Sequence, residues 1–159
     1  MDFQIIALNH ELFEPMFNFS DTELAEIGGI RMVVDENPGF PCRVSLEDGK
    51  IGEEVILIPF EFHQTKSPYQ AKGPIFIRKG VKQCILKKNE IPKMLSHRLL
   101  SFRGYNKIGI MKTAMTNEGE NTKEIIEKIF IDPEINYVHI HNSSPGCFNC
   151  EVRRVIEKN

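Results

Sequence analysis

The segment at residues 137–150, YVHIHNSSPGCFNC, holds the densest set of side chains in the sequence that could do chemistry. It places His139, His141, Cys147 and Cys150 within fourteen residues. Imidazole nitrogens and thiolate sulfurs bind metals and take part in redox reactions. A Ser-Ser-Pro-Gly sequence, typical of a turn, separates the two pairs. The segment therefore predicts where a site lies, although it names no substrate.

A strand at residues 137–141 would place the two histidines side by side. Residues two apart on a strand point to the same face, so His139 and His141 would lie together. If the turn closes a hairpin, two registers are open, and they differ in which residues oppose the histidines. The opposing residues would be Phe148 and Cys150 in one register, or Cys147 and Asn149 in the other.

Three interpretations of this segment are open. A zinc site would use His139, His141, Cys147 and Cys150, but the two pairs lie closer together than in most structural zinc sites. A redox pair would use the two cysteines, but the nine residues after them are too few for a thioredoxin-like fold. In the third interpretation the histidines hydrogen-bond at a sheet edge and the thiols pack as small apolar groups. We therefore expect no cofactor, and zinc is the metal to test.

Arginines embedded in apolar sequence form a second set of candidate site residues. In PGFPCRVSL, at residues 38–46, the prolines and glycine predict a rigid turn from which Cys42 and Arg43 emerge. Such arginines either pair with carboxylates inside the protein or converge on a carboxylate or phosphate ligand. Both alternatives stay open for the whole set, which comprises Arg43, Arg78, Arg98 and Arg103.

Composition limits the class of protein. The 159 residues, 41% apolar and 26% charged, fit a single domain over residues 1–159. The net charge of −2 argues against a nucleic-acid partner, because such proteins usually carry a basic excess. No apolar run approaches the roughly 20 residues of a membrane helix, so we expect no membrane partner. A small-molecule ligand is the partner that the candidate residues favour, and the oligomeric state is not predicted.

The N-terminal sequence MDFQIIALNHELF lacks the basic start and long apolar core of a secretory signal. We therefore expect a cytoplasmic protein. In that compartment the four cysteines would be reduced, so structural disulfides are not expected.

The elements that must position these residues are mainly strands. Two capping-box patterns, Ser20 with Glu23 and Asn121 with Glu124, each predict a helix start, and residues 90–95 could form another short helix. The tail at 151–157 fits a strand or a helix, and we favour the strand. The fold class is α+β, with a mostly antiparallel sheet that could close into a barrel and two or three short helices. The other predicted strands are residues 3–8, 30–34, 42–46, 54–60, 74–78, 99–105, 108–116 and 137–141.

Five motifs occur in order along most of the chain: PGFPCRVSL, SPY, GPIFIR, RLLSFRGY and HIHNSSPGCF. With them the chain resembles a family of short, mostly bacterial proteins of unknown function. The resemblance implies no activity. It does imply that His139, His141, Asn142 and Cys147 belong to the family's closing pattern, whereas Cys150 does not. This weakens the zinc and redox interpretations, because both need Cys150.

Our leading hypothesis is a polar cleft that binds a small anionic ligand. Arginines would hold the anion, and histidines would donate hydrogen bonds or move a proton near neutral pH. Alternatively, the chain is a metal- or thiol-dependent enzyme using His139, His141 or Cys147, or a non-catalytic protein in which these residues are structural. The predicted ligand-binding residues are Cys42, Arg43, Arg78, Arg103, His139, His141, Asn142 and Cys147.

Overall fold

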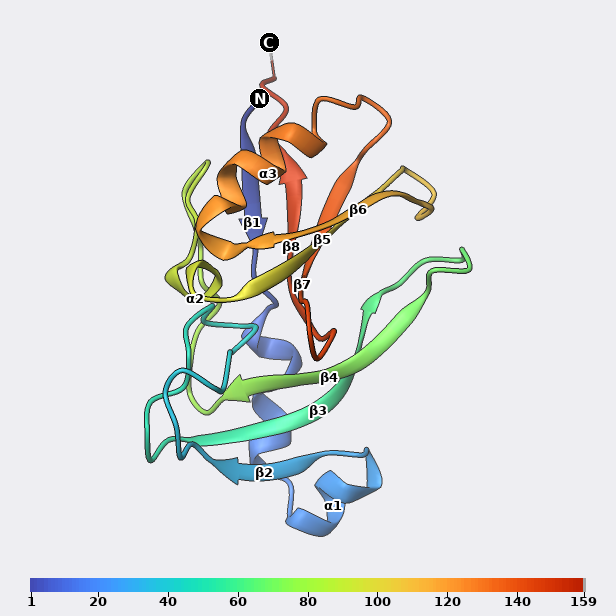
Figure 1. The fold of residues 1–159 in the computed structure, drawn as a ribbon. Coiled ribbons are helices and arrows are strands. Elements are labelled where there is room, and N and C mark those ends of the chain that lie inside the picture. Colours follow the sequence, from blue (N-terminus) through green and yellow to red (C-terminus); the bar gives the residue numbers. More distant parts are fainter. Residues whose placement is uncertain (159) are drawn as a thin grey trace.

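A five-stranded antiparallel sheet forms one half of the computed structural model, which describes residues 1–158 (Figure 1). Its edge strands are the first and the sixth in the chain. The described N- and C-terminal segments lie side by side because the first strand pairs with the last. In spatial order the strands are β1 (Phe3–Ile6), β8 (Phe148–Arg154), β7 (Tyr137–Asn142), β5 (Leu99–Tyr105) and β6 (Met111–Glu118).

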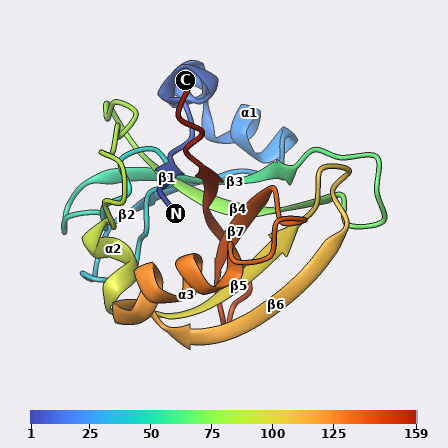
Figure 2. The ribbon, with the colours of Figure 1, turned by 90° about the horizontal axis from the view of Figure 1, so that it is seen from above.

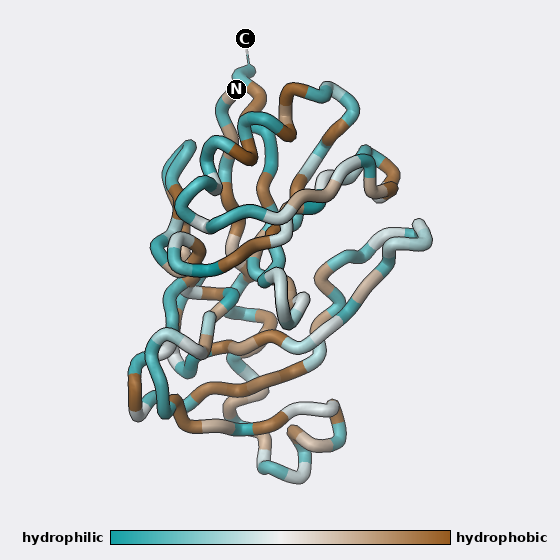
Figure 3. Tube along the Cα trace, viewed as in Figure 1, coloured by the Kyte–Doolittle hydropathy of each residue, from teal (hydrophilic) through white to brown (hydrophobic). Residues whose placement is uncertain are grey.

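A three-stranded antiparallel sheet forms the other half, in the order β2 (Ile30–Val33), β3 (Glu54–His63) and β4 (Ala71–Arg78). Its strands carry the apolar stretches visible in the lower part of Figure 3. The two sheets remain separate, so the α+β prediction is confirmed while the barrel does not form. Among residues 1–158 no helix combines the length and apolar character that a membrane crossing requires.

The strand predicted at residues 42–46 is wrong. These residues form a tight loop in which the amide of Leu46 donates to the carbonyl of Cys42 at 3.0 Å. Leu46 has a φ of 52°, in the left-handed region. Only a single parallel bridge, Cys42 to Phe76, links the loop to β4. Because Cys42, Val44 and Leu46 are all buried, their alternation with other residues resembled a strand pattern.

Three α-helices occur within the described residues: α1 (Asp21–Glu26), α2 (Lys93–Ser96) and α3 (Thr122–Ile129). The capping box at Ser20 is present, with both reciprocal hydrogen bonds at 3.1 Å. The second predicted box is absent, because the Asn121 amide donates to Asn117 Oδ1 at 2.8 Å instead of capping α3. Three 3₁₀ turns complete the set: η1 (His10–Leu12), η2 (Glu14–Asn18) and η3 (Gly119–Asn121).

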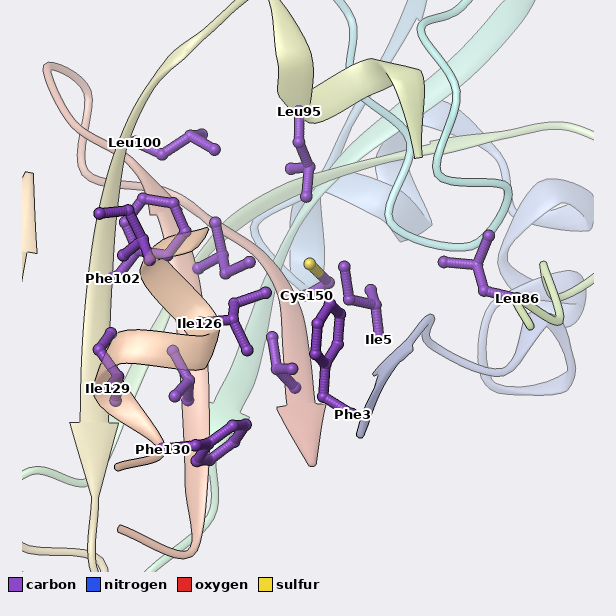
Figure 4. Packing of buried hydrophobic residues seen from close by; sticks show 14 of the residues in the cluster. Phe3, Ile5, Leu86, Leu95, Leu100, Phe102, Ile126, Ile129, Phe130 and Cys150 are labelled. Atoms are coloured by element: carbon purple, nitrogen blue, oxygen red, sulfur yellow. The ribbon is translucent and has the colours of Figure 1, made fainter. Parts of the chain in front are cut away.

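The main core lies between α3 and one face of the five-stranded sheet (Figures 2 and 4). The predicted apolar stripe of α3, including Ile125, Ile126 and Ile129, packs on this face. Here β7 contributes Val138 and Ile140 to the core. Because side chains alternate along a strand, the histidines of β7 point to the opposite face, toward the three-stranded sheet. The fold therefore separates an apolar face from a polar one along a single strand.

Candidate functional site

The β7–β8 hairpin positions the residues singled out in the sequence. The tail is a strand, as predicted, and the Ser-Ser-Pro-Gly turn closes the hairpin. A β-bulge sets the register: His139 lies opposite Glu151, while His141 lies opposite Phe148. The register that places Phe148 and Cys150 opposite the histidines is therefore right for Phe148 and wrong for Cys150, because it assumed an uninterrupted ladder. The bulge brings Glu151 to the histidine face, which the sequence pattern alone did not indicate.

Cys150 lies on the other face of β8, opposite Ile140 and inside the main core. Burial raises the pKa of its thiol to about 12. Cys147 is half-buried at the end of the turn, and both cysteines are free thiols. The structure therefore does not bring the four proposed zinc donors together, nor does it form a CxxC pair at a helix start. Within residues 1–158 no three His, Cys, Asp or Glu side chains are arranged to hold a metal ion.

His141 is fully buried on the polar face of β7. Its Nδ1 donates to the carbonyl of Gly146 at 2.9 Å, which leaves Nε2 as an acceptor with no protein partner. Burial lowers the pKa of His141 to about 3, and nearby Arg103 adds to this effect. The ring is therefore neutral at physiological pH.

His139 is also fully buried, two residues away on the same face. Its Nε2 donates to Glu151 Oε2 at 3.1 Å, and its Nδ1 has no protein partner. Burial acts to raise the pKa of Glu151, but hydrogen bonds from His139 and Arg153 outweigh it and lower that pKa below its usual value. Glu151 is therefore held as a carboxylate, which fixes the tautomer of the His139 ring.

A third histidine, His63 at the end of β3, completes the polar face. Its Nδ1 donates to the carbonyl of Tyr69 at 2.7 Å, and its Nε2 accepts from the Tyr137 hydroxyl at 2.6 Å. Burial lowers the pKa of His63 and raises that of Tyr137 to about 12. Sequence reasoning did not select His63, Tyr137 or Glu151: His63 reaches this face only because the two sheets meet, and Glu151 only because of the bulge.

The loop that carries Arg43 and the turn of the β7–β8 hairpin meet at a cavity of about 440 Å³. This cavity, called here the Arg43 pocket, brings together three of the eight predicted ligand-binding residues, Arg43, Asn142 and Cys147, whereas Arg103, His139 and His141 do not line it. It also includes Arg98, which the hypothesis did not place among the ligand-binding residues. The complete lining is Gly39, Pro41, Arg43, Phe76, Arg98, Leu99, Asn142, Ser144, Pro145 and Cys147.

Arg43 joins the two sheets. Its backbone amide donates to the carbonyl of Phe76 in β4, and its Nε donates to the carbonyl of Phe148 in β8 at 2.7 Å. The guanidinium also donates from Nη1 to the carbonyl of Pro41. Arg43 is 1% exposed, yet no carboxylate of the described chain lies within ion-pairing distance of it. Burial lowers the pKa of Arg43, and the neighbouring Cys147 is the group that most opposes this shift.

A short chain of hydrogen bonds orients Cys147. Asn149, at the bulge, donates from Nδ2 to Asn142 Oδ1 at 2.8 Å. This bond sets the orientation of the Asn142 amide, whose Nδ2 then donates to Cys147 Sγ at 3.2 Å. The Oδ1 atom of Asn149 is buried without a partner. An amide donor and a buried guanidinium therefore both lie beside the Cys147 sulfur.

Arg78 lies outside the pocket, with its donors occupied by side chains of its own chain. It forms two hydrogen bonds with Glu53, at 3.0 and 3.1 Å, and further bonds with Glu47 and Ser45, each at 3.1 Å. We call these four residues the Arg78 cluster. Cys42 is fully buried beside it, and its sulfur accepts the backbone amide of Arg78 at 3.4 Å. Neither Arg78 nor Cys42 lines the Arg43 pocket.

The other two arginines, Arg98 and Arg103, also differ in whether a carboxylate of the chain binds them. Arg98 reaches the Arg43 pocket, but both of its Nη groups bind Asp48. Arg103 lies opposite His139 on β5, and its Nε donates to Ser101 Oγ at 3.2 Å. We use the name intersheet cluster for Arg43, which has no counter-charge, together with three buried residues that each have one polar atom without a partner: His139, His141 and Asn149.

The fold and the pocket define a class: an α+β protein of two antiparallel sheets with an arginine-containing pocket where the sheets meet. Residues 39–154, well over half of the chain, match the family described as "Protein of unknown function (DUF1203)", and the chain belongs to that family. This confirms the resemblance noted from the motifs. No curated protein and no solved structure matches the chain significantly.

Proposed function

We propose that the chain binds a small anionic ligand in the Arg43 pocket. The observation that carries the proposal is the state of Arg43, a fully buried cation at the wall of a cavity with no carboxylate of its own chain beside it. Removing a charge from water costs several kcal/mol unless an opposite charge and hydrogen bonds compensate. Two backbone carbonyls supply hydrogen bonds, but no negative charge. A bound anion would supply it.

The other buried arginines support this assignment by contrast. Arg78 is 6% exposed and is neutralised by Glu47 and Glu53, and Arg98 is neutralised by Asp48. Arg78, the more deeply buried of the two, is therefore paired with carboxylates of its own chain, whereas Arg43 is not. We limit the predicted site accordingly: Arg43, Asn142 and Cys147 are kept, while Arg78 and Cys42 are assigned to structural roles.

The test is thermal unfolding with added anions at constant ionic strength, using acetate, benzoate and inorganic phosphate as probes. We expect at least one anion to raise the melting temperature in a saturable way, because a ligand that binds only the folded state stabilises it. Replacing Asn142 by Asp places a carboxylate in the pocket while keeping the oxygen that accepts from Asn149. The apparent affinity of N142D for the anion should be at least tenfold lower than that of the unsubstituted protein.

Asn136→Asp is the matched control, because Asn136 is exposed and the substitution changes the net charge equally. N136D should respond to the anion as the unsubstituted protein does. The proposal fails if no probe raises the melting temperature at concentrations that exceed the protein by more than 50-fold and reach the millimolar range. It also fails if N142D responds to the anion as the unsubstituted protein does. In either case Arg43 is a structural residue.

A second candidate function, thiol chemistry at Cys147, rests on the hydrogen bond from Asn142 and the proximity of Arg43. Both groups would stabilise a thiolate nucleophile. Burial lowers the pKa of His141 to about 3, which makes its free Nε2 a weak base, so we assign it no role in deprotonating the thiol. Iodoacetamide labelling followed by mass spectrometry tests this candidate. Cys147 should react faster than the other half-buried cysteine, Cys84, and equal rates would exclude an activated thiol.

A further inference from the structure

The charge of the Arg43 pocket indicates the charge of its ligand. The lining contains two arginines and no carboxylate. Arg98 is already neutralised, because Asp48 binds both of its Nη groups. One positive charge, that of Arg43, therefore remains open. A monoanion would balance this charge, whereas a dianion such as a phosphate monoester would leave an excess negative charge in a partly enclosed site.

The open donors of Arg43 indicate the shape of the anionic group. A guanidinium has five N–H donors in a planar fork. Nε is occupied by Phe148 and one Nη1 donor by Pro41, and the Cys147 sulfur also lies beside the guanidinium, so the donors open to a ligand are among the others on Nη1 and Nη2. Two adjacent donors in one plane match the two oxygens of a carboxylate. The second proton on Asn142 Nδ2 and the Ser144 hydroxyl are the other neutral donors in the lining.

The rest of the wall is apolar. Phe76 is half-buried against Phe40, with the ring centroids 4.9 Å apart, and one side of it lines the pocket. Leu99 is 46% exposed at the same cavity, although it is a large apolar residue on a strand. Pro41 and Pro145 extend this surface on either side. A volume of about 440 Å³ exceeds what a bare carboxylate fills and lies within the range of small-molecule sites.

From the charge, the donors and the wall together, we infer that the ligand is a monocarboxylic acid with an apolar body, an inference that rests on the proposed function. The carboxylate lies on the Nη edge of Arg43, and the apolar body covers Phe76 and Leu99. Benzoate and hexanoate carry this chemistry. Acetate has the carboxylate without the body, and inorganic phosphate has a different charge and geometry.

Isothermal titration calorimetry with these four probes, at matched ionic strength, tests the inference. We expect benzoate or hexanoate to bind at least tenfold more tightly than acetate, and phosphate to bind more weakly than either. Leu99→Ala should weaken benzoate at least threefold and leave acetate unchanged, because it removes only apolar contact area. Ile108→Ala is the matched control, since Ile108 is 70% exposed and does not line the pocket.

The outcomes separate the inference from the proposed function. If phosphate binds best, or if acetate binds as tightly as benzoate, the pocket takes anions but the carboxylic-acid assignment is wrong. If L99A binds benzoate as tightly as the unsubstituted protein does, the proposed contact between the apolar body and Leu99 is wrong, even if benzoate binds more tightly than the other probes. If none of the four probes binds, the proposed function itself fails.

Discussion

The Arg78 cluster and the intersheet cluster are two buried polar regions that differ in how far the protein's own side chains satisfy their polar groups. Arg78 has a carboxylate or hydroxyl on each donating group, all from its own chain. The intersheet cluster holds a buried cation without a carboxylate and three buried atoms without partners, on His139, His141 and Asn149. Buried polar groups are normally satisfied. The difference is that only one of these regions has its polar groups satisfied by side chains of its own chain.

The largest effect should come from breaking the complete region. Arg78→Met would leave the Glu53 carboxylate, which is mostly buried, without its bidentate partner. Removing one member of such a pair typically costs about 3 kcal/mol. We expect urea denaturation to report a loss of about this size. Lys79→Met, which breaks an ion pair between the exposed Lys79 and the half-buried Glu54, should cost less than about 1 kcal/mol, because Glu54 keeps Arg31 as a partner. Equal losses would mean that the Arg78 cluster is not a stabilising unit.

The next effect is the pH dependence that the buried histidine imposes. The pKa of His141 is lowered from 6.5 to about 3 in the folded protein, so between these values the unfolded chain binds more protons. Stability therefore falls as the pH drops below about 6.5, by about 1 kcal/mol per pH unit until the folded protein protonates near pH 3.

Replacement of His141 by Asn should flatten this slope, because the amide can still donate to Gly146 but does not titrate. The measurement is the free energy of unfolding at pH 7, 6 and 5. Identical slopes for H141N and the unsubstituted protein would show that another group controls the acid response. His63, whose pKa burial also lowers from 6.5, would be that group, because the unfolded chain binds a proton there before the folded protein does.

The two clusters also differ in how far sequence could predict them. The alternation of β7 and the capping box at Ser20 depend on near neighbours, and both are confirmed. The β-bulge of the hairpin adds one residue to β8, and the apolar pattern of the sequence does not reveal this extra residue. Arg43 and Arg78 occur in similar apolar surroundings, so the sequence left their partners open. The partners of Arg78 are at least 25 residues away in the chain, and the bond from Arg43 to Phe148 depends on how the two sheets meet.

A smaller effect should follow when Arg43 is replaced by Met. The substitution removes hydrogen bonds to the carbonyls of Pro41 and Phe148, but it also removes a buried charge that lacks a carboxylate. These changes oppose each other, so we expect a loss of about 1.5 kcal/mol, roughly half that of R78M. Urea denaturation of both variants under identical conditions makes the comparison. A loss at Arg43 as large as at Arg78 would place both arginines in the same structural class.

The smallest effect concerns the end of the polar face beyond His139. Tyr137→Phe removes the hydrogen bond from the Tyr137 hydroxyl to His63 Nε2. Both residues also line a second cavity of about 480 Å³, so water can replace the hydroxyl as the donor. We expect a loss of about 0.5 kcal/mol in the free energy of unfolding.

A much larger loss in Y137F, of the size expected for R78M, would mean that the polar groups near His63 depend on the protein's own side chains as strongly as those of the Arg78 cluster do. The boundary between the two kinds of region would then lie between His63 and His139, whose ring centroids are only 4.9 Å apart. A small loss would instead extend the incomplete region from the Arg43 pocket across the whole polar face of β7. Buried hydrogen bonds without a nearby cavity cost more to remove than those that water can reach, and this difference makes the substitution decisive.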